Sequence, residues 1–151
     1  MTPDFSLRAA TSADLPFLIE LRLATMVPHF ARQGIALSPE EHRLRAAFRL
    51  DATRLIERAS GPVGVIKVLR EDGLWTVEQL QVASACQGRG IGAAVLRAVI
   101  AESVAAGAEL RLSVLKQNPA RHLYGRLGFK TLEESDTSYK MTWAAPTPSD
   151  V

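Results

Sequence analysis

The chain has a single cysteine, Cys86, among its 151 residues. One thiol cannot form a disulfide within the chain, and so low a cysteine content is typical of a reducing compartment. The N-terminus lacks the charged and then apolar segment of a secretory signal, and no apolar run approaches the length of a membrane span. We therefore expect a cytoplasmic protein with no membrane partner.

An excess of charge of one sign is also missing. The 18 basic residues and 16 acidic residues leave a formal net charge of +2, and the basic residues form no concentrated patch. We therefore expect no nucleic-acid partner. His42 and His122 lie on predicted helices without partners at metal-ligand spacing, so we expect no metal site either.

The remaining composition is that of an ordinary soluble globular protein, with 47% apolar and 23% charged residues. A chain of this length fits one domain and can bury roughly two-thirds of its unfolded surface. The sequence contains no internal repeat, low-complexity tract or interdomain linker. We expect a single domain over residues 1–145 and a loose C-terminal tail over residues 146–151.

Apolar residues repeat with the period of strands in seven segments and with the period of helices in four. The strand-like segments are residues 5–9, 53–59, 63–70, 75–82, 110–115, 130–135 and 138–143. The first helix is expected to break at Met26 because Pro28 and Gly34 follow, and the helix from Gly90 is expected to be sandwiched between other elements. We predict an α/β fold of the α+β type, with a mixed, mostly antiparallel central sheet of six or seven strands flanked by about four helices.

A glycine-rich turn, Gln-Gly-Arg-Gly-Ile-Gly at residues 87–92, joins the predicted strand 75–82 to the third helix. Such a turn leaves backbone N–H groups free at a helix N-terminus, where they can hold a phosphate. A P-loop is excluded, because a Lys-Ser/Thr pair would have to follow the last glycine, whereas Ala93 and Ala94 follow Gly92.

A dinucleotide-binding turn is the second interpretation. Gly88, Gly90 and Ala93 fit its spacing, and Glu109 lies at a suitable distance for a ribose carboxylate. The context disfavours it, because the loop 83–87 separates the strand from the first glycine. Glu109 also precedes an apolar run, whereas the ribose carboxylate should close a strand.

The third interpretation is Gln/Arg-x-x-Gly-x-Gly/Ala after a strand and a short loop, which Gln87, Gly90 and Gly92 match. This pattern resembles the pyrophosphate signature of the GCN5-related N-acetyltransferases (GNATs). A second motif lies downstream, where a strand ends near Asn118 and a short helix carries Leu-Tyr at 123–124 and closes at Gly-Phe. It resembles the other half of the coenzyme A site of the family, and together the two motifs cover residues 75–129.

The resemblance implies that the sheet is splayed between its fourth and fifth strands and that acetyl-CoA binds in the gap as co-substrate. In the family, backbone N–H groups on the fourth strand bind the thioester carbonyl, which implies this role for Val82 or a neighbour. Asn118 would bind the pantetheine arm, while Arg89 either adds charge to the phosphates or faces solvent. The implied cofactor-binding residues are Val82, Gln87, Gly88, Arg89, Gly90, Ile91, Gly92, Asn118 and Tyr124.

Two residues are the catalytic candidates. Matching the Leu-Tyr of the family, Tyr124 would protonate the departing thiolate as general acid. Glu78 would serve as the base, directly or through water, or else orient the substrate or support the structure. By strand alternation Glu78 shares a face with Leu80 and Val82, although a bulge could reverse which side chains meet the substrate.

The resemblance implies an N-acetyltransferase that moves an acetyl group to a primary amine by direct attack through a tetrahedral intermediate. A coenzyme A sensor without transfer chemistry and a nucleotide-binding oxidoreductase module are the alternatives. Small-molecule and peptide amines both remain open as acceptors, and a homodimer is an option, since dimers are common in the family. The family builds its acceptor pocket from the N-terminal helices and the last hairpin, which here carry Met26, His29, Phe30, Arg32 and Tyr139.

Overall fold

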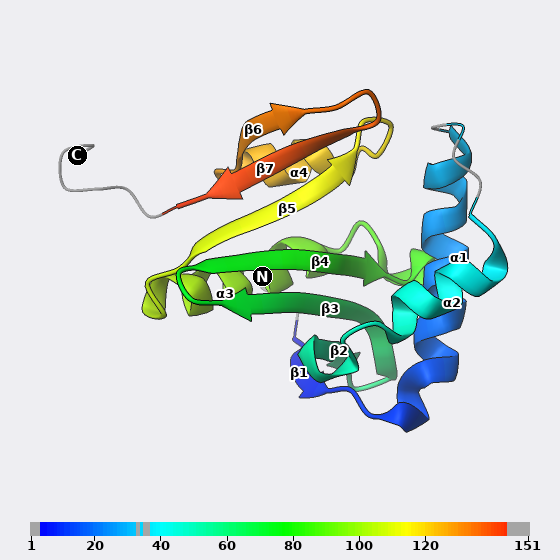
Figure 1. Ribbon diagram of the computed structural model, residues 1–151. Helices are drawn as coiled ribbons and strands as arrows, with labels where there is room; N and C mark the ends of the chain where they lie inside the picture. Colours follow the sequence, from blue (N-terminus) through cyan, green and yellow to red (C-terminus); the bar gives the residue numbers. More distant parts are fainter. Residues whose placement is uncertain (1–3, 33, 35–36, 145–151) are drawn as a thin grey trace, which may run out of the picture.

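A computed structural model describes residues 4–32, 34 and 37–144, so the predicted tail at 146–151 lies outside the described residues. Seven strands form one sheet in the order β1-β2-β3-β4-β5-β7-β6 (Figure 1). They are β1 (Ser6–Ala9), β2 (Thr53–Arg58), β3 (Gly61–Glu71), β4 (Leu74–Val82), β5 (Glu109–Leu115), β6 (Lys130–Glu134) and β7 (Ser138–Trp143). All neighbours are antiparallel except the parallel pair β4 and β5, so the predicted mixed sheet is confirmed.

Four α-helices flank the sheet: α1 (Leu15–Arg32), α2 (Pro39–Ala47), α3 (Ile91–Ala105) and α4 (Ala120–Arg126). The main core forms where α3 and α4 pack against the strands, and it includes Val95, Val99, Leu110 and Tyr124. A second core under α1 and α2 includes Leu18, Leu21, Leu55 and Val65. The sheet therefore has two helical layers, and each covers a different set of its side chains.

Two helix predictions were wrong. Helix α1 does not break at Met26 but runs through Pro28 to Arg32. Proline removes only one backbone donor, and the burial of Leu21 and Phe30 on the same helix outweighs that loss. Helix α3 is not sandwiched, because its apolar side packs on the sheet while Arg97 and Val104 on the other side are exposed.

The sheet opens between β4 and β5, as predicted. Their pairing begins with Leu74 opposite Glu109 and ends with Val77 opposite Leu112, although both strands continue beyond these residues. Figure 1 shows the two strands moving apart toward their C-terminal ends. The splay leaves one edge of β4 without a partner strand, next to the N-terminus of α3.

A β-bulge interrupts the pairing of β3 with β4 at Glu78. Lys67 pairs with Gln79 and Val68 with Val77, so Glu78 is an extra residue on β4. A bulge turns its two residues toward roughly the same face of the sheet. Glu78 therefore lies with Gln79 on the side of α1 and α2, so the face given by alternation was wrong, and the bulge that the sequence analysis left open is present.

Lys67 fixes the C-terminal end of α2 to the sheet. Its side chain is fully buried, and Nζ donates to the carbonyl oxygens of Arg45 (3.0 Å), Ala46 (3.4 Å) and Phe48. Burial lowers the pKa of Lys67 to about 8, while the carboxylate of Glu78 opposes that shift. A cation at a helix C-terminus is favourable, because the last carbonyl groups have no partner within the helix.

Replacing Lys67 by Met should lower the free energy of unfolding by about 2–4 kcal/mol, because it leaves buried carbonyl groups without donors. Urea unfolding measures this loss, and Lys130→Met on the exposed strand β6 is the control, expected within about 0.5 kcal/mol of wild type. The pKa of Lys67 lies below its ordinary value, so the unfolded chain binds more protons between about pH 8 and 10.5. The free energy of unfolding of the wild type should therefore gain a contribution as the pH rises from about 8 to 10.5. The Lys67→Met variant should lack this contribution.

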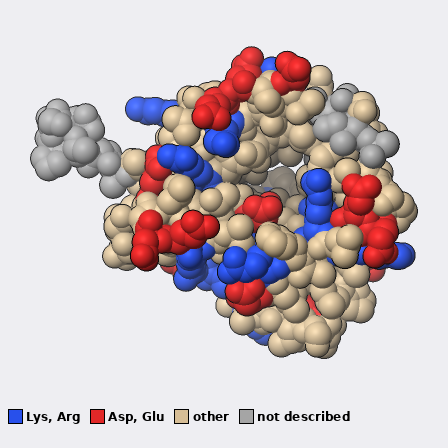
Figure 2. Space-filling view, viewed as in Figure 1, with Lys and Arg blue, Asp and Glu red and all other residues tan. Residues whose placement is uncertain are grey.

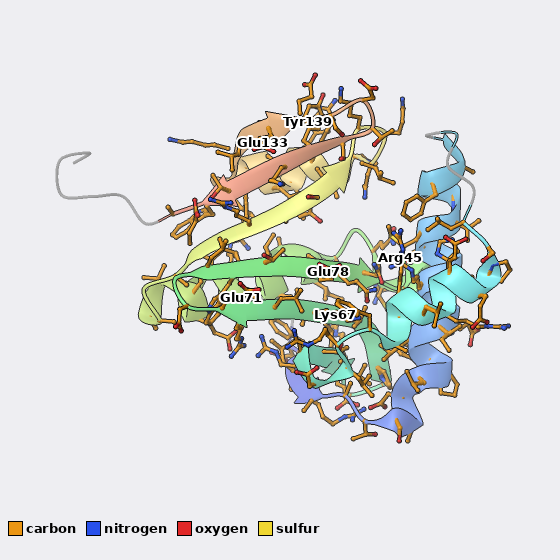
Figure 3. All side chains as sticks on the ribbon, in the orientation of Figure 1. Arg45, Lys67, Glu71, Glu78, Glu133 and Tyr139 are labelled. Carbon is orange, nitrogen blue, oxygen red and sulfur yellow. The ribbon has the colours of Figure 1, made fainter. Side chains whose placement is uncertain are left out.

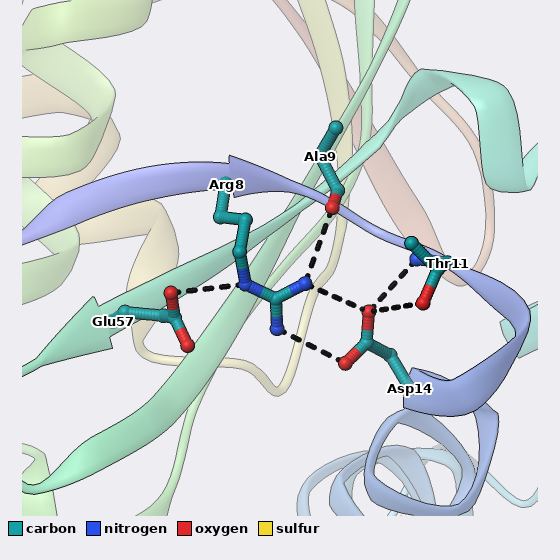
Figure 4. Close-up of polar contacts among 5 residues, drawn as sticks. All are labelled: Arg8, Ala9, Thr11, Asp14 and Glu57. Carbon is teal, nitrogen blue, oxygen red and sulfur yellow. Dashed lines mark hydrogen bonds and ion pairs between the residues drawn. The ribbon is translucent and has the colours of Figure 1, made fainter.

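Arg8 joins β1 to β2 and to the start of α1 (Figure 4). Its Nε donates to Glu57 at 3.0 Å, and its two terminal nitrogens donate to Asp14 at 3.0 and 3.1 Å. These hydrogen bonds lower the pKa of Asp14, whose carboxylate also accepts the backbone N–H of Thr11 at 2.8 Å. The network anchors the N-terminal end of α1, the helix that contributes Arg22 and Met26 to the site described below.

Candidate active site

Two adjoining cavities of about 520 Å3 each lie where the sheet splays. One contains the glycine-rich turn, and we call it the glycine-turn cavity. The other contains the carboxylate of the bulge, and we call it the Glu78 cavity. Figure 2 shows the hollow at the centre of this face. The residues that line both cavities are Met26, Leu80, Gln81, Asn118 and Tyr124.

The glycine-turn cavity collects all but one of the predicted cofactor-binding residues. Arg89 is exposed and lines neither cavity, so its contribution to phosphate binding stays a prediction. The predicted residues that line the glycine-turn cavity are Val82, Gln87, Gly88, Gly90, Ile91, Gly92, Asn118 and Tyr124. The structure thus brings the two halves of the predicted site together across the splay.

Backbone conformation explains the glycines of the turn. Gly88 (φ 79°) and Gly90 (φ 77°) adopt the left-handed region, which side chains other than glycine rarely occupy. Gly92 differs, because it lies in the first turn of α3, and a Cβ placed there would meet no atom within 4 Å. The fold does not require glycine at 92, so the residue keeps the space beside the helix N-terminus open.

Replacing Gly92 by Ala should raise the free energy of unfolding by about 0.5–1 kcal/mol, because alanine favours the helix. The same methyl group should weaken acetyl-CoA binding about tenfold, equivalent to the loss of one hydrogen bond to a charged group. Titration calorimetry and thermal unfolding measure the two effects separately. Gly125→Ala on α4 is the matched control, since that glycine also faces open space but lines neither cavity. An unchanged affinity in Gly92→Ala would contradict the predicted role of the turn in phosphate binding.

The side chain of Gln87 closes the loop that precedes the turn. Its Nε2 donates to the carbonyl oxygen of Val82 at 2.8 Å, across the loop between β4 and α3. The glutamine of the signature therefore ties the turn to the end of the strand. Sequence reasoning assigned Gln87 to the ligand and did not foresee this internal contact.

The free edge of β4 faces the gap. The N–H of Ala83 donates to the carbonyl of Val63 at 2.8 Å, and Val82 pairs with Gly64 in the adjoining position. Hydrogen-bonded and non-hydrogen-bonded pairs alternate along antiparallel strands. The N–H groups of Leu80 and Val82 therefore point away from β3, toward the side from which β5 has diverged.

Tyr124 lies at the junction of the two cavities and is buried, with 8% of its surface exposed. Its ring packs edge-on against Phe129, with the centroids 6.0 Å apart. Burial raises the pKa of Tyr124 to about 12, so its hydroxyl stays protonated at neutral pH. That hydroxyl makes no hydrogen bond to any residue within the described part of the chain.

Glu78 is exposed in its cavity and faces positive charge. Arg22 and Arg45 line the same cavity, and the carboxylate of Glu78 raises the pKa values of both Arg22 and Lys67 against the effect of their burial. Figure 3 shows Glu78 on β4 and Arg45 on α2 in the same region of the molecule. The Glu78 cavity can therefore bind a positively charged group and a negatively charged group at once.

Arg22 is a buried cation that sequence reasoning missed. Only 4% of its surface is exposed, and its Nε donates to Nδ1 of His42 at 3.2 Å. Burial, followed by the charge of Arg45, lowers the pKa of Arg22 to about 10, so the guanidinium remains charged at neutral pH. A signal was present in the sequence, because Arg22 follows Leu18 by four residues on the apolar side of the predicted helix.

His42 holds Arg22 in place. It is buried on α2, and its ring packs edge-on against Phe30, with the centroids 5.7 Å apart. Burial and the nearby arginines lower the pKa of His42, so the neutral ring can accept from Arg22 through Nδ1. Nδ1 of His42 is therefore engaged with Arg22, which fixes the orientation of the ring.

Two glutamines of β4 complete the wall of the Glu78 cavity. Gln79 donates to the carbonyl oxygen of Arg45 at 3.1 Å. Gln81 is buried, with 7% of its surface exposed, and its Oε1 has no hydrogen-bond partner in the described part of the chain. An acceptor without a donor at a buried position is unfavourable, and a ligand N–H in the cavity would satisfy it.

The predicted acceptor residues separate into three groups. Met26 and Phe30 line the Glu78 cavity, as expected. Tyr139 lies outside both cavities, where the cations of Lys116 and Arg121 pack on its ring. The side chains of His29 and Arg32 lie outside the described residues.

No helix in the described part of the chain is long and apolar enough to cross a membrane. Over the same residues, no group of three or more histidine, cysteine, aspartate or glutamate side chains is placed to hold a metal ion.

The splayed sheet, the glycine turn and the Tyr124 junction agree with a family comparison. A model of the acetyltransferase (GNAT) domain matches residues 27–144. The chain belongs to the GNAT acetyltransferase family. The predicted family and enzyme class are thereby confirmed, and the oxidoreductase interpretation is excluded. A search of curated proteins finds no significant match to this GNAT protein.

Solved structures show the same fold. An acetyltransferase from Thermus thermophilus superposes with a TM-score of 0.75 at 22% identity, over 93% of this chain and 97% of that chain. The PaiA N-acetyltransferase from Thermoplasma acidophilum, solved with coenzyme A, gives 0.72 at 19% identity over 93% and 98%. The ribosomal-protein-S18-alanine N-acetyltransferase from Escherichia coli gives 0.70 at 18% identity over 92% of each chain.

Proposed function

We propose that this GNAT protein transfers an acetyl group from acetyl-CoA to a primary amine by direct attack. The observation that carries the proposal is the meeting of the two cavities at Tyr124, beside the unpaired edge of β4. Two substrates that occupy separate cavities can react only where those cavities meet. Among the described residues, that junction holds a hydroxyl and backbone N–H groups without hydrogen-bond partners, and the Glu78 cavity supplies a carboxylate.

The glycine-turn cavity suits coenzyme A. The N-terminus of α3 and the open space at Gly92 would accept the pyrophosphate, since helix N-termini bind anions. The free edge of β4 would pair with the amide groups of the pantetheine arm, as an added strand does. Asn118 accepts the N–H of Ala120 through Oδ1 at 2.9 Å, and its amide nitrogen would be available to donate to the arm.

The backbone of β4 would bind the thioester carbonyl. Sequence reasoning named Val82 or a neighbour for this role, and the geometry favours Leu80. The N–H groups of both residues face the gap, but Leu80 lines both cavities, whereas Val82 lines only the glycine-turn cavity. A fixed N–H at that point would stabilise negative charge on the carbonyl oxygen as the amine attacks.

Two side chains would then handle the protons. Glu78 would accept a proton from the attacking ammonium, directly or through water. The hydroxyl of Tyr124 would donate to the sulfur as the carbon–sulfur bond breaks. A free thiol has a pKa of about 8.5, well below that of Tyr124, so a hydrogen bond to the developing thiolate is the part of this role that the structure supports best.

The test has two stages. Titration calorimetry with acetyl-CoA and with NADPH first asks which ligand binds, and acetyl-CoA alone is expected to give heat. Release of free thiol is then followed across a panel of amines that includes amino acids, polyamines and short peptides. Binding without thiol release on any amine would favour a coenzyme A sensor, and no binding of acetyl-CoA would refute the proposal altogether.

A further inference from the structure

The Glu78 cavity contains a buried cation with no anion of its own. Arg22 donates through Nε to His42, and its two terminal nitrogens make no hydrogen bond to any described residue. The described part of the chain places no carboxylate within ion-pair distance of Arg22, although eight other basic residues there form such pairs. A guanidinium that is 4% exposed and lacks an anion is costly to bury, unless a ligand supplies the anion.

Neighbouring side chains fix the position of the buried Arg22 guanidinium. His42 accepts from Arg22, Phe30 packs on His42, and the cation of Arg45 lies over the ring of Phe30, 5.8 Å from its centroid. Arg45 also lines the cavity and has no ion-pair partner among the described residues. An arginine fixed through Nε presents its terminal N–H groups in a planar fork, a geometry that matches a carboxylate.

From this arrangement we infer that the acceptor is an amine that also carries a carboxylate, an amino-acid-like molecule whose carboxylate binds Arg22. The inference rests on the proposed function and concerns the substrate class of the same site. The ammonium of such a molecule would lie near Glu78 and the orphan Oε1 of Gln81, at the junction with the other cavity. One zwitterion would therefore satisfy the unpaired cation, the free carboxylate and the unpartnered acceptor together.

The apolar residues of the cavity limit what else the acceptor can be. Met26, Phe30, Leu44 and Phe48 surround the charged groups, so an apolar or short side chain on the acceptor fits better than a second cation. A polyamine would bring positive charge toward Arg22 and Arg45, where like charges repel. The cavity thus selects against polyamines by the same residues that select for a carboxylate.

The substrate-side test uses wild-type protein. Thiol release is measured with the common L-amino acids and with their primary amides, at pH values where each amine is uncharged to the same extent. The best acid is expected to exceed its own amide about 10- to 100-fold in kcat/KM, since a hydrogen-bonded charge is lost. Amides that react as well as their acids, or a preference for amines without a carboxylate, would overturn the inference.

The protein-side test uses Arg22→Gln, Arg22→Lys and Arg97→Gln. Arg22→Gln should raise KM for the acid about 10- to 100-fold and leave KM for the amide within about twofold, while Arg22→Lys should restore part of the loss. Arg97 is exposed on α3 outside both cavities, so its variant should match wild type. Equal losses for acid and amide in Arg22→Gln would show a structural role and overturn the inference.

Calorimetry with acetyl-CoA checks that each variant is folded. It also distinguishes a failure of the inference from a failure of the proposed function. If acetyl-CoA binds and neutral amines react without preference for a carboxylate, the inference fails alone. If no amine of the panel reacts, the proposed function fails first, and the inference fails with it.

Discussion

Replacing Tyr124 by Phe is expected to lower kcat about 100- to 1,000-fold and to leave the affinity for acetyl-CoA within about twofold. The ring would still pack on Phe129 and fill the junction of the two cavities. Only the hydroxyl is lost, and that group has no partner among the described residues. The expected loss in kcat therefore reflects weaker stabilisation of the transition state, in which the sulfur acquires negative charge.

Single-turnover measurement of thiol release, with saturating acetyl-CoA, tests this prediction. Tyr139→Phe is the matched control, because that tyrosine lies outside both cavities and should lose no activity. The pKa of Tyr124 is raised to about 12, so the wild-type rate should not fall between pH 7 and 10 through loss of the Tyr124 proton. If Tyr124→Phe kept wild-type kcat across that range, the general-acid assignment would be wrong.

Structural features that depend on neighbouring residues in the chain could be predicted from the sequence. The glycine-rich turn, the start of α3 after it and the short helix α4 after Asn118 depend on neighbours in the chain. Their motifs could therefore be read directly. The splay between β4 and β5 was predicted only through the family resemblance, since no pattern within either strand shows where their pairing ends.

Residues that depend on distant contacts were not predictable. The bulge at Glu78 arises from the register between β3 and β4, and strand alternation alone placed this side chain on the wrong face. The continuation of α1 through Pro28 depends on burial of Phe30 against α2. Arg22 was visible as a charge on an apolar stripe, but its importance follows from the missing ion pair, which only the structure reveals.

Replacing Glu78 by Gln is expected to lower kcat/KM about 100-fold at pH 7, where nearly all of an amine is protonated. The isosteric amide keeps the size of the side chain but cannot accept the proton of the attacking ammonium. The loss should shrink as the pH approaches the pKa of the acceptor amine, because a neutral amine needs no base. Thiol release measured from pH 7 to 10 in both proteins gives the ratio of wild-type to variant kcat/KM at each pH.

Glu71→Gln is the control for Glu78→Gln, because Glu71 is an exposed carboxylate at the end of β3 that lines neither cavity (Figure 3). The variant at 78 also removes the carboxylate that raises the pKa of Lys67, so urea unfolding should accompany the kinetics. A deficit that stays constant from pH 7 to 10 would contradict the base assignment. A deficit confined to KM that shrinks as the amine loses its charge would mean that Glu78 binds the ammonium while water removes its proton. An unchanged kcat/KM would exclude both roles for Glu78.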